Sequence, residues 1–201
     1  MVQPFAGVGY TVDGGLGMRV LVIVGSRSPT GQTGSAAEAL AQGSREKGVE
    51  VEIRLLPLLR IERCRQCDDD GWGQCRREGS CVIPDNLGSL TEDIRRSDAL
   101  VVATPVYFGD LSESTRAFLD RLRRVTRTDA AKVGIVGKRA VGICVAGGGG
   151  GGAPSCSVSL ERALASIGFD VVDMIPARRQ NLQHKLAVLK STGAWLAGAG
   201  L

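Results

Sequence analysis

The chain has 201 residues, of which 43% are hydrophobic and 23% are charged, a composition typical of a soluble globular protein with one sizeable core. Aromatic residues make up only 4%, which argues against a base-stacking nucleic-acid surface, and the formal net charge of +4 suits an anionic cofactor without requiring DNA or RNA. No apolar run reaches the length of a membrane-spanning helix, and the first residues lack the pattern of a secretory signal. We therefore expect a cytoplasmic protein with no nucleic-acid or membrane partner.

Short apolar runs alternate with helical patterns along most of the chain. Residues 1–17 show no periodicity and are expected to form a disordered or loosely ordered tail, followed by one domain over residues 18–201. Strands are predicted over residues 18–24, 49–55, 99–103, 138–146 and 169–174. Helices are predicted over residues 35–47, 85–96 (with Asp85 as a cap), 112–124, 157–167 and 182–196. This alternation predicts an α/β doubly wound, five-stranded parallel sheet that binds ligands beyond the carboxyl ends of its strands.

The loop after the first predicted strand, residues 25–33 (GSRSPTGQT), is rich in hydroxyl groups. A helix amino end supplies unbonded N–H groups and partial positive charge, which suit a phosphate. The loop has neither the Walker lysine spacing nor the glycine spacing of the dinucleotide fingerprint. Such loops also serve as simple helix caps, but its position and hydroxyl density favour phosphate binding. The candidate side chains are Ser26, Arg27, Ser28, Thr30, Gln32 and Thr33.

Two further loops follow the third and fourth predicted strands. In residues 104–110 (TPVYFGD), Tyr107 and Phe108 are either rings that lie against a planar ligand or core residues. Residues 147–152 are six successive glycines, which form either a flexible flap or a loop whose backbone closely approaches a flat ligand. Because parallel strands end at the same edge of a sheet, we expect these loops beside the hydroxyl-rich loop.

Four of the six cysteines fall within one segment, residues 62–83, which we call the cysteine segment. Cys64 and Cys67 form a CxxC pair, Cys75 follows after seven residues and Cys81 after five more. Four thiolates on one loop can hold a cubane iron–sulfur cluster or a structural zinc, and a reducing cytoplasm keeps them available. Metal-free thiols or a disulfide are the remaining alternatives.

In their order along the chain, these motifs resemble a known family. The residues GSRSPTGQT, CRQC…GSCVIPDNL and SDALVVATPVYFGDLSESTRAFLDRL are similar to those of the NADPH-dependent FMN reductases and, more narrowly, of the iron–sulfur flavoproteins of the flavodoxin-like superfamily. The resemblance extends from residue 18 to about residue 172. It implies a flavodoxin-like sheet with strand order 2-1-3-4-5, noncovalently bound FMN, and a homodimer or homotetramer.

The resemblance also implies roles for individual residues. Ser26, Ser28, Gln32 and Thr33 would hold the FMN phosphate, with Arg27 beside them. Pro105, Val106, Tyr107, Phe108 and Gly109 would line the ring and the ribityl chain, and Gly147 and Gly148 would approach the flavin. Cys64, Cys67, Cys75 and Cys81 would ligate a [4Fe–4S] cluster. Residues 68–72 (DDDGW) look like an insertion before the third cysteine of the more compact set in the iron–sulfur flavoproteins.

Two functions follow from these expectations, and both make the protein an oxidoreductase. The first is an electron-transfer protein that joins FMN to a [4Fe–4S] cluster and receives electrons from a ferredoxin-like donor. The second is a cluster-free enzyme that takes hydride from NAD(P)H and reduces flavin or a quinone. In both, the cofactors carry the difficult chemistry while the protein positions the flavin and tunes its potential.

Overall fold

The structure, a computed structural model, describes residues 17–198, so that the predicted tail lies almost entirely outside the described residues. The strands are β1 (Arg19–Val24), β2 (Glu50–Leu55), β3 (Ala99–Tyr107), β4 (Asp110–Leu111), β5 (Arg139–Ala146) and β6 (Asp170–Arg178). The α-helices are α1 (Gln32–Arg45), α2 (Gln74–Glu78), α3 (Leu87–Arg96), α4 (Glu113–Val125), α5 (Asp129–Lys132), α6 (Ala153–Ile167) and α7 (Leu182–Gly198).

The five long strands form a parallel sheet in the order β2-β1-β3-β5-β6. Counted without the short β4, this is the predicted order 2-1-3-4-5, and the predicted flavodoxin-like sheet is confirmed. The prediction missed β4, a two-residue antiparallel strand that pairs Val106 with Leu111 and Tyr107 with Asp110. This hairpin carries β3 to Tyr107, four residues past its predicted end at residue 103.

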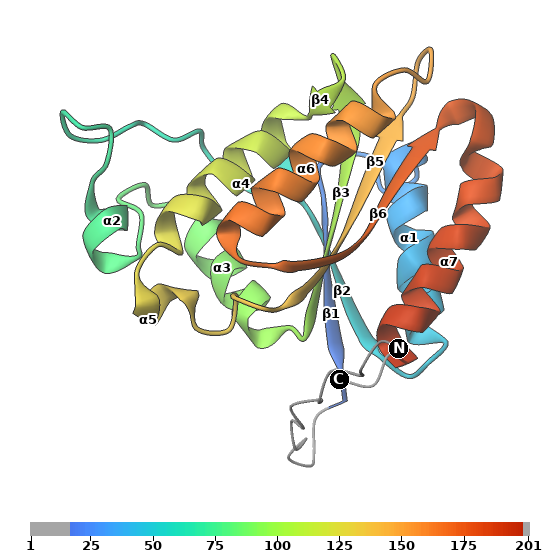
Figure 1. The fold of residues 1–201 in the computed structure, drawn as a ribbon, viewed down its shortest axis with the longest axis horizontal. Helices are drawn as coiled ribbons and strands as arrows, with labels where there is room; N and C mark the ends of the chain where they lie inside the picture. Colours follow the sequence, from blue (N-terminus) through green and yellow to red (C-terminus); the bar gives the residue numbers. More distant parts are fainter. Residues whose placement is uncertain (1–16, 199–201) are drawn as a thin grey trace, which may run out of the picture.

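Helices cover both faces of the sheet (Figure 1). Helices α1 and α7 pack on one face, where Leu40 and Leu189 belong to the same apolar cluster as β1. Helices α3, α4 and α6 pack on the other, where Phe118 and Leu160 are fully buried. Full burial of one such side chain stabilises the fold by about 1.5–3 kcal/mol. Within residues 17–198, none of the helices combines the length and apolar character needed to cross a bilayer.

Helices α1 and α7 approach each other closely through small residues. A Cβ on Gly43 would lie 1.9 Å from the carbonyl oxygen of Lys190, and one on Gly193 would lie 2.0 Å from that of Leu40. Ser44 Oγ also donates to the carbonyl of Gly193 at 3.0 Å. This contact fixes the position of α1, and therefore of the loop that precedes it.

Three helix starts differ from the predictions by two or more residues. Helix α6 begins at Ala153, four residues before its predicted start. Helix α1 begins at Gln32, three residues before its predicted start, so that Gln32 and Thr33 lie in its first turn. Helix α3 begins at Leu87 with Asn86 as its N-cap. Asp85 accepts a hydrogen bond from the Leu87 N–H at 3.1 Å, but its main partner is a buried arginine, described below. The predicted capping role of Asp85 was therefore incomplete.

Candidate functional site

The hydroxyl-rich loop runs from β1 into the amino end of α1. The N-cap of α1 is Gly31, and within the described chain no side chain caps this helix and no acidic residue lies in its first turn. The first N–H groups of α1 are therefore available to a ligand. Thr33 is buried, Ser26 is half-buried, and Arg27 and Ser28 are exposed. An uncapped helix start beside hydroxyls and a cation suits a phosphate.

Gln32 connects this loop to the glycine run. A Cβ on Gly147 would lie 3.5 Å from Gln32 Oε1. That oxygen is buried, and no described residue donates a hydrogen bond to it. A buried polar atom without a partner costs about 1–3 kcal/mol. The position of the amide therefore fits a ligand that supplies the missing hydrogen bond.

The end of β3 presents two aromatic side chains to solvent. Tyr107 is 48% exposed and Phe108 is 107% exposed. The interpretation of these two residues as core residues is therefore wrong. Pro105 and Val106 are half-buried at the end of β3, and the chain turns at Phe108 and Gly109 with positive φ angles of 52° and 77°. The turn leaves both rings free to contact a flat ligand.

Hydrogen bonds join the three loops at one edge of the sheet. Ser112 Oγ and Ser114 Oγ donate to the carbonyl of Gly25 at 3.3 and 3.1 Å, which ties the first loop to the start of α4. Ser155 Oγ donates to the carbonyl of Gly109 at 2.8 Å, which ties the β3–β4 turn to α6. Figure 1 shows the β3–β4 turn and the β5–α6 loop at the same end of the molecule. The predicted phosphate, aromatic and glycine loops are therefore neighbours.

The glycine run is held on both sides. Gly147 is half-buried beside Gln32, whereas Gly148 is exposed. Gln180 Nε2, beyond the end of β6, donates to the carbonyl of Gly149 at 3.1 Å. The absence of side chains leaves the exposed backbone of this run open to close approach by a ligand.

The cysteine segment borders a separate small cavity. All four of its cysteines line this cavity of about 20 Å³, together with Arg65, Arg121 and Arg124. The thiols are free and half-buried. Among the described residues, no group of three or more Cys, His, Asp or Glu side chains is arranged to hold a metal ion. The four sulfurs suit a thiolate-bound metal in chemistry and number, but they would have to converge in order to ligate it.

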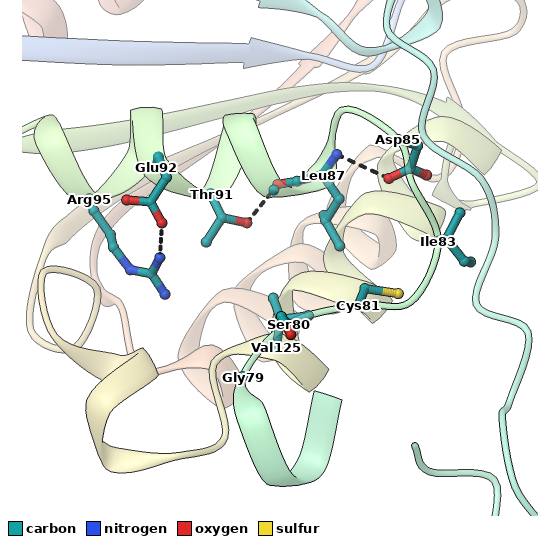
Figure 2. A pocket seen from close by; sticks show the side chains of 11 residues that line it. Gly79, Ser80, Cys81, Ile83, Asp85, Leu87, Thr91, Glu92, Arg95 and Val125 are labelled. Carbon is teal, nitrogen blue, oxygen red and sulfur yellow. Dashed lines mark hydrogen bonds and ion pairs between the residues drawn. The ribbon is translucent and has the colours of Figure 1, made fainter. Parts of the chain in front are cut away.

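A buried ion pair attaches the cysteine segment to α4. The side chains of Arg121 and Asp85 are 1% and 0% exposed, and two hydrogen bonds join them, one of them from Nη2 to Oδ1 at 3.1 Å. Asp85 also accepts hydrogen bonds from the N–H groups of Glu62 at 2.9 Å and Leu87 (Figure 2). Burial alone would raise the pKa of Asp85, but the hydrogen bonds from Arg121 and the backbone outweigh it and lower that pKa.

The sequence contained a signal for this pair that the predictions missed. Arg121 lies three residues after Phe118 and four before Val125, and therefore on the apolar face of α4. A cation at such a position requires a buried partner. That partner cannot be identified from local sequence, because Asp85 reaches α4 only through the tertiary fold.

The predicted insertion, residues 68–72, folds against α4. The guanidinium groups of Arg124, Arg76 and Arg127 lie 4.5, 5.4 and 5.6 Å from the centre of the Trp72 ring, within cation–π range. Arg124 Nη1 also donates to the carbonyl of Gly71 at 2.8 Å. Because Gly71 and Arg124 both line the cysteine cavity, the hydrogen bond between them forms part of its wall.

A second pocket, of about 260 Å³, shares Cys81 with the cysteine cavity. It lies between α3, the chain leading into α3 and the end of α4 (Figure 2). Figure 2 shows the Cys81 sulfur pointing away from Thr91 and Arg95, which lie along α3. Cys81 therefore stands in the wall between the two cavities.

The sheet order defines a flavodoxin-like fold, and the three loops at the ends of β1, β3 and β5 lie at the edge where such sheets bind their ligands. Residues 18–173 match the family of NADPH-dependent FMN reductases. The chain belongs to this family, as predicted.

Curated relatives match about half of the chain. The chain is 29% identical over 106 residues to an iron–sulfur flavoprotein of Methanocaldococcus jannaschii, covering 53% of this chain and 52% of the relative. It is 31% identical over 117 residues to an NAD(P)H dehydrogenase (quinone) of Paracoccus denitrificans, covering 57% and 51%. The chain thus spans about half the length of the curated relatives it matches.

Solved structures support the fold. The NAD(P)H:quinone oxidoreductase from Methanothermobacter marburgensis aligns with a TM-score of 0.64 at 22% identity, covering 90% of this chain and 96% of that one. A flavodoxin from the domain Archaea aligns with a TM-score of 0.59 at 16% identity, covering 90% and 98%. At these identities the likeness supports the flavodoxin-like fold alone.

Proposed function

We propose that the protein binds FMN at the three joined loops and passes electrons between FMN and an iron–sulfur cluster held by the cysteine segment. The observation that carries FMN binding is the meeting of an uncapped helix start, exposed aromatic rings and a glycine run at one sheet edge, next to the unpartnered Gln32 Oε1. When bound, FMN accepts electrons as a hydride pair and releases them singly. The chain binds and orients the flavin there.

The proposed FMN-binding residues all lie on the three loops or in the first turn of α1. The α1 N–H groups and nearby hydroxyls would hold the phosphate, and the exposed rings of Tyr107 and Phe108 would contact the flavin. The backbone of the glycine run would approach the ligand directly. The full set is Ser26, Arg27, Ser28, Gln32, Thr33, Pro105, Val106, Tyr107, Phe108, Gly109, Gly147 and Gly148.

Support for a [4Fe–4S] cluster comes from the cysteine cavity and from relatives named iron–sulfur flavoproteins. Thiolates are the ligands that iron–sulfur clusters require. The cations Arg65, Arg121 and Arg124 line the same cavity and would offset the negative charge of four thiolates. The proposed ligands are Cys64, Cys67, Cys75 and Cys81.

A second candidate function is a cluster-free reductase that takes hydride from NAD(P)H and reduces flavin or a quinone. It is favoured by the separation of the thiols, which in the described residues form no metal-binding group. Relatives named NAD(P)H dehydrogenase (quinone) support it as well. For both functions we propose a cytoplasmic homodimer or homotetramer, and for the first a ferredoxin-like donor.

Anaerobic purification with analysis of flavin, iron, sulfide and zinc tests these proposals. The protein should release FMN on heating and contain about four iron and four sulfide per chain. Cys64→Ser should lose the cluster and keep FMN, because the flavin loops are separate from the cysteine segment. FMN without iron after anaerobic reconstitution would support the cluster-free reductase. Zinc without sulfide would indicate a structural metal, and recovery of FAD or of no flavin would contradict FMN binding.

A further inference from the structure

Arg121 is buried in the wall of the cysteine cavity, and one nitrogen of its guanidinium group has no hydrogen-bond partner among the described residues. Its Nη1 donates to Asp85 and to the carbonyl of Glu62, and its Nη2 donates to Asp85. Its Nε–H is buried, and no described residue accepts a hydrogen bond from it. Buried donors without an acceptor are rare in folded proteins, and a bound ion or ligand can supply the acceptor where one occurs.

The cavity offers sulfur as the complementary acceptor. Four cysteines line the cavity. The guanidinium group interacts with the Cys81 thiol, but its Nε–H still has no acceptor among the described residues. The guanidinium is a rigid planar fork, so two hydrogen bonds to Asp85 fix the direction of its Nε–H. A fixed cationic donor beside four thiols suits an anionic, sulfur-bearing group.

We propose that Arg121 is a positioning residue whose Nε–H donates a hydrogen bond to a sulfur atom of the metal-loaded cysteine cavity, either a ligating thiolate or a cluster sulfide. This inference rests on the proposed ligation by the cysteine segment and adds Arg121, oriented by Asp85, as its supporting contact. Such outer contacts orient metal ligands, and hydrogen bonds to sulfur tune the potential of a cluster.

Co²⁺ alone is a suitable probe, because its thiolate absorption reports ligation without requiring a cluster. The full-length, reduced, metal-free protein would be titrated with Co²⁺. Arg121→Lys keeps the positive charge opposite Asp85 but lacks the Nε–H donor. We expect its Co²⁺ affinity to fall about 10- to 100-fold, as is typical when an outer-shell partner of a metal site is lost. Arg123→Lys, on the same helix but outside the cavity, is the matched control and should bind Co²⁺ as wild type does.

A measurement on the wild-type protein covers the case in which Arg121→Lys does not fold. Saturating ¹⁵N-labelled protein with Zn²⁺ should shift the Arg121 Nε–H resonance and slow its exchange with water. An unchanged Co²⁺ affinity in folded Arg121→Lys, or an unchanged resonance in Zn²⁺-saturated wild type, overturns the inference even if the cluster is present. If Co²⁺ binding depends on Arg121 but the reconstituted protein contains no iron or sulfide, only the proposed cluster is overturned. Failure of the wild type to bind Co²⁺ or Zn²⁺ overturns the inference, whereas the analysis of iron and sulfide decides the proposed cluster by itself.

Discussion

The buried pair between Asp85 and Arg121 predicts a large loss of stability in Asp85→Asn. The carboxylate is fully buried and accepts two hydrogen bonds from Arg121 and two from backbone N–H groups. Asparagine keeps the shape of the side chain but removes its charge, so that Arg121 would stay buried without a counter-ion. Breaking a buried ion pair in this way costs about 3–5 kcal/mol.

The expected loss can be measured as a change in melting temperature at neutral pH. For a chain of this length, each kcal/mol shifts Tm by about 2–4 °C, so Asp85→Asn should melt about 6–20 °C below wild type. Asp129→Asn is the matched control. Asp129 is 99% exposed, pairs with Lys132 at 2.9 Å and should hardly change Tm, because exposed pairs contribute little. If the Tm of Asp85→Asn were no lower than that of Asp129→Asn, the stabilising role of the buried pair would be refuted.

Three further predictions concern pH, helix packing and the flavin site. The pKa of Asp85 is lowered on folding, so the stability difference between wild type and Asp85→Asn should be fully present above the ordinary value of 3.8. This difference should shrink as pH falls through the folded-state pKa, and denaturant melts at several pH values would measure it. Gly193→Ala should lose about 1–3 kcal/mol of unfolding free energy in denaturant, because its Cβ would lie 2.0 Å from the Leu40 carbonyl oxygen. The control Gly88→Ala should lose none, because its Cβ would meet open space. Tyr107→Ala should keep the fold but alter the absorption and potential of bound flavin, and unaltered values would place its ring away from the flavin.

The sheet could be predicted because its strands carry their own signal. Residues 20–24 and 99–103 are continuous apolar runs, and both are buried in the structure. Alternation with helices then allows only parallel crossovers, which place three of the connecting loops at one edge. The resemblance supplied the strand order, and the structure confirmed it.

The features that were missed depend on partners distant in sequence or on unusual local signals. Helix α1 starts at Gln32 after a glycine N-cap, so none of the usual capping side chains marked its first residue. Strand β4 has only two residues, too few to show an alternating pattern, although it pairs with Val106 and Tyr107 in a local hairpin. The spacing of the cysteines determines how many thiols lie on one segment, but it does not determine how closely the four sulfurs approach one another.

FMN titration tests the central claim most directly. The dissociation constant would be measured by flavin fluorescence for wild type and for the double variant Ser26→Ala/Thr33→Ala, which removes two hydroxyls beside the uncapped start of α1. Each hydrogen bond to a charged phosphate contributes about 1.5–3 kcal/mol, so the double variant should bind FMN at least about tenfold more weakly. An unchanged dissociation constant in the folded double variant would contradict the account by showing that the phosphate lies elsewhere.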